Sequence, residues 1–116
     1  MSKLLFIEYP KCTTCQRAKK FLESQGCDFE ARHIVENRPT TDELRKWITQ
    51  SGLPVKKFFN TSGLRYKALA LKDKLPAMSD EEQIALLASD GMLVKRPLLV
   101  SANTVRVGFK QAEWEK

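Results

Sequence analysis

The 116-residue chain contains no uninterrupted apolar run long enough to cross a bilayer, so it predicts no membrane-spanning helix and no membrane partner. Its first apolar stretch is short and ends at Tyr9-Pro10-Lys11, which is not the pattern of a secretory signal peptide. Glycine and proline number five each, too few for a collagen-like or low-complexity chain. These absences favour a cytoplasmic globular protein, and the length suits a single domain over residues 1–116.

Charge of one sign is not concentrated in any part of the sequence. The 20 basic and 14 acidic side chains give a formal charge of +6, spread without a basic tail. Binding to nucleic acid is typically signalled by a basic stripe interleaved with aromatic residues. We therefore expect no direct contact with nucleic acid, whereas the mild positive excess suits anionic partners in general.

The chain has only three cysteines and one histidine, too few for a secreted disulfide framework. No serine and aspartate accompany His33 in a way that suggests a catalytic triad, so we interpret it as structural. No glycine-rich phosphate loop is present. Two of the cysteines stand as Cys12-Thr13-Thr14-Cys15, and in a reducing compartment such a pair indicates reactive or metal-binding thiols.

Apolar periodicity predicts a strand–helix–strand unit at the start of the chain. The apolar run over residues 3–9 stops at Pro10 and is typical of a buried strand. Helical spacing follows from Thr14 to about Gly26, where a glycine suits the end of a helix. Residues 29–35 then predict a second strand, parallel to the first with a right-handed crossover.

Two capping boxes predict helices in the middle of the chain. Thr40 with Glu43, and Ser79 with Glu82, have the spacing at which a hydroxyl and a carboxylate satisfy the first N–H groups of a helix. The expected elements here are a helix ending at Gly52, a less regular segment over residues 53–76 with a turn at 61–63 and a short helix over 66–71, and a helix ending near Asp90-Gly91.

Two short apolar runs at residues 98–100 and 105–107, separated by four residues, predict an antiparallel hairpin. Residues 110–116 are compatible with a last helix. A parallel pair joined to a hairpin gives a mixed four-stranded sheet with helices on its faces. This α/β plan is that of a thioredoxin-like domain with a helical insert between the strand–helix–strand unit and the hairpin.

The cysteine pair falls where the first strand ends and the first helix begins. Unpaired N–H groups and the dipole at a helix N-terminus stabilise an anion. A free thiol of pKa ~8.5 is only about 3% ionised at pH 7, and a decrease of ~1.5–2 units would ionise roughly half of it or more. Basic residues near in sequence that would add to this effect are Lys11, Arg17, Lys19 and Lys20.

The two cysteines are expected to differ. Cys12 precedes the helix and should be exposed at its tip, whereas Cys15 shares a helical face with Ala18 and Leu22 and should point inward. We therefore predict that Cys12 attacks as a thiolate and that Cys15 resolves the product as an internal disulfide.

A zinc site is the rival interpretation, because Cys12, Cys15, Cys27 and His33 have a superficially metal-like spacing. A helix between them would place Cys27 about 18 Å from Cys15. Zinc ligands lie within ~2.3 Å of the metal, so this geometry argues against the site. Two inert cysteines are the remaining alternative for the pair, and Cys27 is most simply a free thiol.

Lys95-Arg96-Pro97 stands immediately before the hairpin. Proline is poorly accommodated inside a ladder, so Pro97 should open the strand, and an Arg–Pro bond is one that can adopt the cis form. Arg96 is a candidate to bind an oxyanion or a partner's backbone near the thiolate. The competing interpretation is an ordinary solvated surface arginine.

With these residues placed, the chain resembles the ArsC/Spx family of thioredoxin-fold proteins over nearly its whole length. The resemblance rests on residues 9–15 (YPKCTTC), Pro39 with residues 41–44 (TDEL), residues 93–100 (LVKRPLLV) and residues 107–109 (VGF). The arsenate reductases of this family resemble the chain at Cys12, their nucleophile position, and at Arg96, one of their oxyanion-binding arginines.

Two further arginines of those reductases align with Asn60 and Phe109, so an arsenate would lack two charge-assisted contacts. Those enzymes also usually rely on an outside thiol, where this chain has Cys15. The Spx-type regulators share the cysteine pair and bind the C-terminal domain of the RNA polymerase α subunit. Gly52 matches a glycine of that contact, and Thr49 stands where they carry an arginine.

The sequence and the resemblance together predict a thiol–disulfide oxidoreductase of the ArsC family, with Cys12 as nucleophile, Cys15 as resolving thiol and Arg96 as a third catalytic residue. Substrate contacts are expected from Lys11, Thr13, Thr14 and Pro97. We expect no bound cofactor; a small thiol, disulfide or oxyanion is the substrate, and glutathione or a thioredoxin-type reductant donates the electrons. The alternative is a redox-sensing transcriptional regulator that binds the C-terminal domain of the RNA polymerase α subunit.

Overall fold

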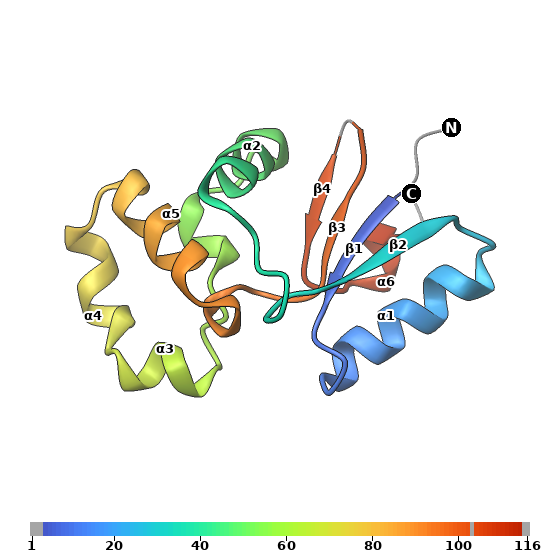
Figure 1. The fold of residues 1–116 in the computed structure, drawn as a ribbon, viewed down its shortest axis with the longest axis horizontal. Helices are drawn as coiled ribbons and strands as arrows, with labels where there is room; N and C mark the ends of the chain where they lie inside the picture. Colours follow the sequence, from blue (N-terminus) through green and yellow to red (C-terminus); the bar gives the residue numbers. More distant parts are fainter. Residues whose placement is uncertain (1–3, 103, 115–116) are drawn as a thin grey trace.

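The computed structural model describes residues 4–102 and 104–114, which form two lobes side by side (Figure 1), with overall extents of 42 × 27 × 26 Å. We call the four strands with α1 and α6 the sheet lobe, and residues 41–93 the insert lobe. The elements in chain order are β1 (Leu4–Glu8), α1 (Thr13–Ser24), β2 (Phe29–His33), α2 (Thr41–Ser51), η1 (Val55–Phe58), α3 (Leu64–Ala68), α4 (Leu71–Lys74), η2 (Leu75–Ala77), α5 (Asp80–Ser89), η3 (Gly91–Leu93), β3 (Leu98–Val100), β4 (Val105–Val107) and α6 (Gln111–Trp114).

The sheet confirms the predicted thioredoxin-like topology, with strand order β2-β1-β3-β4. β1 pairs parallel with β2, with Phe6 opposite Ala31, and antiparallel with β3, where Phe6 faces Leu99. β3 and β4 form the predicted antiparallel hairpin. No helix within the described ranges is long and apolar enough to cross a membrane.

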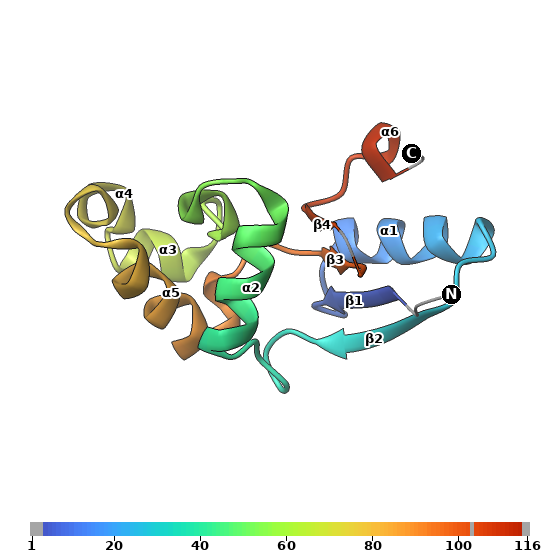
Figure 2. The same ribbon diagram turned by 90° about the horizontal axis from the view of Figure 1, so that it is seen from above.

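Alternation along the central strand β1 divides the core between two faces of the sheet. Phe6 packs with Ala18 and Leu22 of α1 and with Trp114 of α6, so these two helices cover one face (Figure 2). Ile7, the next residue, belongs to a larger cluster that includes most of the buried side chains of the insert lobe. Because successive strand residues point to opposite faces, one strand anchors both halves of the molecule.

β2 ends two residues earlier than the sequence predicts. Nδ1 of His33 accepts hydrogen bonds from the backbone N–H groups of Val35 and Glu36, both at 3.1 Å. These bonds turn the chain away from the sheet, so the ladder stops at His33. The structural interpretation of this histidine is thereby confirmed.

The two predicted capping boxes start α2 and α5 of the insert lobe. The Thr40 hydroxyl accepts from the N–H of Glu43, and the Ser79 hydroxyl accepts from that of Glu82, while each glutamate accepts from the N–H of its cap residue.

The single short helix predicted over residues 66–71 is wrong. The structure has α3 and α4, separated at Ala70, whose left-handed backbone (φ 53°) interrupts the helix.

Polar and backbone contacts hold the insert lobe against the sheet lobe. The guanidinium of Arg32 on β2 forms a bidentate pair with Glu43 on α2 at 2.7 and 2.8 Å, and it lies 5.9 Å from the centre of the Trp47 ring. A Cβ on Gly91 would lie 2.0 Å from the carbonyl oxygen of Ile34, so only glycine permits this approach of the two backbones.

Candidate functional site

Cys12 is the N-cap residue of α1, directly after the turn that follows β1. Its N–H donates to the carbonyl of Tyr9 at 2.9 Å, and its own carbonyl accepts the first helical hydrogen bond, from Gln16 at 3.0 Å. The Gln16 side chain donates to the carbonyl of Pro10 at 2.8 Å and closes the turn. The strand end and the helix start therefore fix the position of this cysteine.

Cys15 lies one turn into the helix and is fully buried. It shares the inward face of α1 with Ala18 and Leu22, as the spacing predicts. Cys12 is half-buried, less exposed than the sequence predicts for a helix tip, and both are free thiols in this structure. The pair thus combines one accessible sulfur with one that is shielded from solvent.

The environment separates the pKa values of the two thiols. Burial opposes ionisation of Cys12. Hydrogen bonds from the backbone N–H and the side chain of Cys15 favour the thiolate, and so do a hydrogen bond and the positive charge of Arg96. Together these contacts outweigh burial, so the pKa of Cys12 lies below its ordinary value. Burial, followed by the proximity of Cys12, raises the pKa of Cys15 to about 12. The accessible sulfur is the one whose anion is favoured.

Arg96 is half-buried, which contradicts the interpretation of a solvated surface arginine. Its guanidinium lies 4.9 Å from the centre of the Tyr9 ring, and the peptide bond that joins it to Pro97 is cis. Its Nε and Nη1 are buried and have no hydrogen-bond partner among the described residues. Arg96 therefore keeps two buried N–H donors without a described partner, while its charge and a side-chain hydrogen bond act on Cys12.

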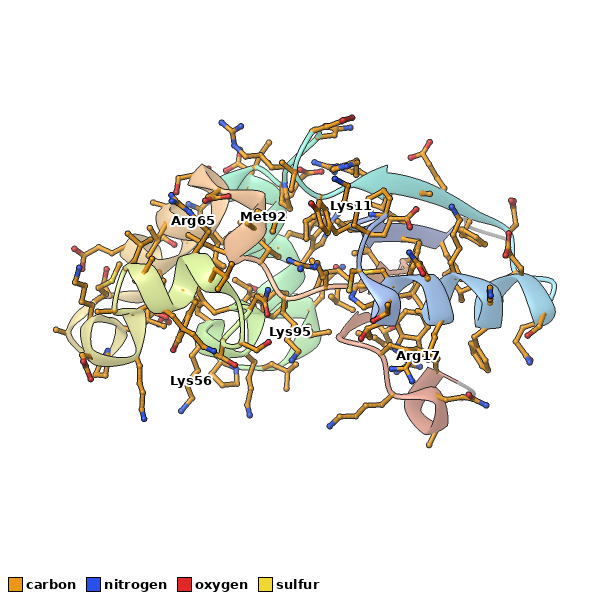
Figure 3. All side chains as sticks on the ribbon, turned by 90° about the horizontal axis from the view of Figure 1, so that it is seen from below. Lys11, Arg17, Lys56, Arg65, Met92 and Lys95 are labelled. Carbon is orange, nitrogen blue, oxygen red and sulfur yellow. The ribbon has the colours of Figure 1, made fainter. Side chains whose placement is uncertain are left out.

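A cleft of about 520 Å³ opens above Cys12 and Arg96, and both lobes line it. Figure 3 shows two of its residues, Arg65 and Met92, on the insert lobe, with Lys95 at the junction of the lobes. The lining residues are Cys12 and Thr14 from the start of α1, Asn60 and residues 62–65 from the segment before and into α3, Met92, Lys95 and Arg96 from the segment before β3, and residues 107–110 after the hairpin.

Of the residues assigned to substrate contacts from the sequence, the structure brings only Thr14 into the cleft. Lys11 and Thr13 are exposed outside it, and Pro97 is buried behind Arg96 at the start of the hairpin. Lys19, expected to add positive potential near the thiolate, is paired with Glu8 at 3.4 Å. Arg96, more than eighty residues from the cysteines in the chain, supplies the positive charge at Cys12.

Sequence reasoning missed the wall of the cleft formed by the insert lobe. It predicted a turn at residues 61–63 but gave this turn no role, although Ser62 and Gly63 line the same cleft as Cys12. Lys110, to which it gave no role in the site, also lines the cleft. The family alignment gave the one signal available, because Asn60 and Phe109, the two positions where arginines were expected, both line the cleft.

Cys27 lies beyond the far end of α1 from the pair, half-buried and packed against the Phe6 cluster. Within residues 4–102 and 104–114, no three histidine, cysteine or acidic side chains are grouped so as to hold a metal ion.

Comparison with known proteins agrees with this fold. A model of the ArsC family matches residues 7–116. An uncharacterized protein of Bacillus subtilis, YusI, is 52% identical over 97% of this chain and 96% of its own, and the regulatory protein MgsR of the same organism is 28% identical over 96% and 86%. The crystal structure of a putative ArsC family related protein from Bacteroides fragilis shares 59% identity with a TM-score of 0.96, covering 98% of this chain and 96% of that one.

Proposed function

This chain belongs to the ArsC family, and from that premise we propose that it is a cytoplasmic thiol–disulfide oxidoreductase that uses Cys12 and Cys15. One observation carries the proposal: an accessible cysteine at a helix N-terminus, whose pKa is lowered, is hydrogen-bonded to a buried second cysteine whose pKa is raised to about 12. A helix-tip thiolate is the nucleophile of thiol exchange, and a protonated neighbour is held in reserve until the first step is complete.

The reaction has two steps. The Cys12 thiolate attacks one sulfur of a substrate disulfide, which forms a mixed disulfide and releases the other sulfur as a thiolate. Cys15 then gives up its proton and attacks the Cys12 sulfur, so that a Cys12–Cys15 disulfide forms and the second substrate thiol leaves. The substrate gains two electrons and the protein loses two, which glutathione or a thioredoxin-type reductant restores.

Arg96 is the third member of the proposed site. Its positive charge and hydrogen bond favour the Cys12 thiolate, and its buried Nε and Nη1 donors point to an anionic or carbonyl oxygen of the substrate. Arsenate fits less well, because Asn60 and Phe109 line the cleft without charge. A disulfide, which needs fewer charged contacts than an oxyanion, is the substrate that we favour.

Turnover of a glutathione mixed disulfide tests this proposal. We expect Cys12→Ser to reduce the rate to background, because a hydroxyl is not ionised at neutral pH. Cys15→Ser should complete one attack and stop as a mixed disulfide on Cys12, which intact-mass spectrometry detects. Peptide mapping of the oxidised wild type should find a Cys12–Cys15 link. A link that includes Cys27, or full turnover by Cys12→Ser, would contradict the proposal.

A redox-sensing regulator that binds RNA polymerase through its α subunit is the second candidate, favoured by the 28% identity with regulatory protein MgsR. Gly52, the residue aligned with the Spx contact, is exposed in a left-handed conformation at the end of α2, and the adjacent Thr49 is also exposed. Retention of the C-terminal domain of the polymerase α subunit by the reduced and oxidised protein separates the two functions. Binding that changes with the oxidation state supports the regulator, and equal absence of binding in both states supports the enzyme.

A further inference from the structure

We propose that the cleft above Cys12 receives a cysteine-bearing segment of another protein, with apolar residues next to its cysteine and acidic residues beyond them. This inference rests on the proposed function and names its substrate class. The occupant follows from three properties of the cleft, namely its size, the charge of its rim and the neutral groups of its walls.

The size of the cleft exceeds what a small oxyanion fills. Its volume of about 520 Å³ falls in the range of pockets that enclose ligands of drug size. Its walls come from both lobes, so a ligand that touches Asn60 on one side and Phe109 on the other spans many atoms. A peptide segment of a few residues meets this requirement, whereas four oxygens around one central atom do not.

The charged side chains that line the cleft are of one sign. Arg65, Lys95, Arg96 and Lys110 line it, and no acidic residue is among the lining residues that the structure describes. Arg65 is held in place by Asp90, which accepts from its Nε at 2.9 Å. Because the basic residues belong to both lobes, they are positioned to meet acidic side chains on either side of a bound cysteine.

The remaining groups of the walls suit a polypeptide. The Asn60 side-chain oxygen accepts from the Ser62 hydroxyl at 3.2 Å, and a primary amide can donate to and accept from a peptide group. Leu64, which is 85% exposed, and Met92 both line the cleft. These two apolar side chains offer contacts to the apolar residues that flank a bound cysteine.

The chemistry is the exchange already described, with a protein cysteine as substrate. The Cys12 thiolate attacks the sulfur of the partner's cysteine in its disulfide, the other sulfur of that disulfide leaves as a thiolate, and Cys15 then displaces the partner's cysteine as a thiol. The partner's disulfide is reduced, the Cys12–Cys15 pair is oxidised, and a low-molecular-weight thiol or dithiol returns the pair to its reduced form.

The test compares matched peptides, each carrying one cysteine as a mixed disulfide with 5-thio-2-nitrobenzoate. The cysteine is flanked by leucines and then by glutamates, glutamines or lysines, and the glutathione derivative serves as the small-thiol alternative. Release of the chromophore gives the rate at which Cys12 attacks. At low ionic strength we expect the glutamate peptide to react about tenfold faster than the lysine peptide, with the ratio falling towards one in high salt.

Two exposed lysines provide the matched variants. Lys95→Glu places a negative charge in the cleft and should lower the glutamate-to-lysine rate ratio by about tenfold, whereas Lys56→Glu makes the same change on η1, outside the cleft (Figure 3), and should keep the ratio within about twofold. In the wild type, the glutamate peptide should also react faster than the glutathione derivative.

Equal rates for all the peptides, an equal effect of both lysine variants, or a faster reaction of the glutathione derivative would each overturn the inference. Reaction of Cys12 with the neutral reagent dithiodipyridine distinguishes the two levels of failure. If Cys12 reacts readily with that reagent while the peptides do not differ, the substrate class is wrong and the proposed function stands. If the neutral reagent also fails, the proposed function itself has failed.

Discussion

The sheet lobe and the insert lobe contribute to the cleft in different ways. The sheet lobe supplies the sulfur through one short turn, in which Cys12 is fixed by neighbours within four residues on either side. The insert lobe supplies a wall, from Asn60 to Arg65 and at Met92, that meets Cys12 only because the whole chain folds. The position of the Cys12 sulfur is thus a local feature of the sequence, and the shape of the cleft around it is a property of the tertiary structure.

The two lobes share one hydrophobic core. Ile7 and Leu98 from the sheet belong to the same buried cluster as Leu44, Phe58 and Leu87 of the insert lobe. Phe6, on the opposite face of β1, belongs instead to the cluster under α1 and α6. The insert lobe should therefore lose its support when the residues of β1 that face it are truncated.

The largest effect that we expect comes from Ile7→Ala. Truncation of a fully buried isoleucine costs about 2–5 kcal/mol of the free energy of unfolding. Trp47 lies in the insert lobe and Trp114 in the sheet lobe, so single-tryptophan variants report on each lobe. Denaturant unfolding followed by tryptophan fluorescence should show both lobes shifting to the same lower midpoint.

Leu22→Ala is the matched control, because it removes a side chain of the other cluster, which is 2% exposed. It should also shift both tryptophans together if the lobes unfold as one unit. If the unfolding midpoint reported by Trp47 stayed unchanged in Ile7→Ala while that reported by Trp114 fell, the insert lobe would be stable without the sheet. The two lobes would then not share one core.

The same contrast explains which parts of the molecule are predictable from sequence. Local signals such as the capping boxes at Thr40 and Ser79 define helix starts that the structure confirms. The strand–helix–strand unit and the hairpin follow from apolar periodicity, and they suffice for the topology of the sheet. The helix break at Ala70 has no such signal, because alanine is a strong helix former and yet its backbone is left-handed at this position.

The candidate site divides in the same way. Cys12 precedes the helix, whereas Cys15 shares a helical face with Ala18 and Leu22, and this difference predicts one accessible and one buried sulfur. The proximity of Arg96 to Cys12 is a tertiary contact, and its half-buried position over the Tyr9 ring follows from the sheet bringing β1 and β3 together. The residues alone left Arg96 open between a group near the thiolate and a solvated surface arginine, and the family resemblance favoured the first.

The second prediction compares the two arginines that the lobes bring to the cleft. Arg96→Met keeps the length of the side chain over Tyr9 but removes the charge and the hydrogen bond that lower the pKa of Cys12, so this pKa should rise. At a pH below the pKa of both proteins, each unit of increase removes about tenfold of the thiolate and returns about threefold in intrinsic nucleophilicity, a net loss of about threefold in rate. The alkylation of Cys12 by iodoacetamide as a function of pH measures the change.

The direction of the pKa change determines the pH range in which the variant reacts more slowly. Cys12 is an acid, so Arg96→Met should slow alkylation below the pKa of the variant, and the loss should disappear above it, where both proteins carry the thiolate. Arg65→Met serves as the control, because Arg65 belongs to the insert lobe and its Nε is engaged with Asp90. If both variants gave the wild-type pH profile, Arg96 would not be the cause of the lowered pKa of Cys12.

The smallest effect concerns the one non-glycine residue with positive φ among those described, Ala70 in the insert lobe. A left-handed conformation costs an alanine about 1–2 kcal/mol, and glycine removes this cost while its more flexible unfolded chain takes back about 0.4–1 kcal/mol. Ala70→Gly should therefore raise the free energy of unfolding by about 0.5 kcal/mol. The same change at the exposed Ala68, in the right-handed helix α3, should lower it by about 0.5–1 kcal/mol. If urea unfolding showed that both variants change the free energy of unfolding in the same direction, the backbone between α3 and α4 would not be strained. The irregularity of the insert lobe would then have a local origin.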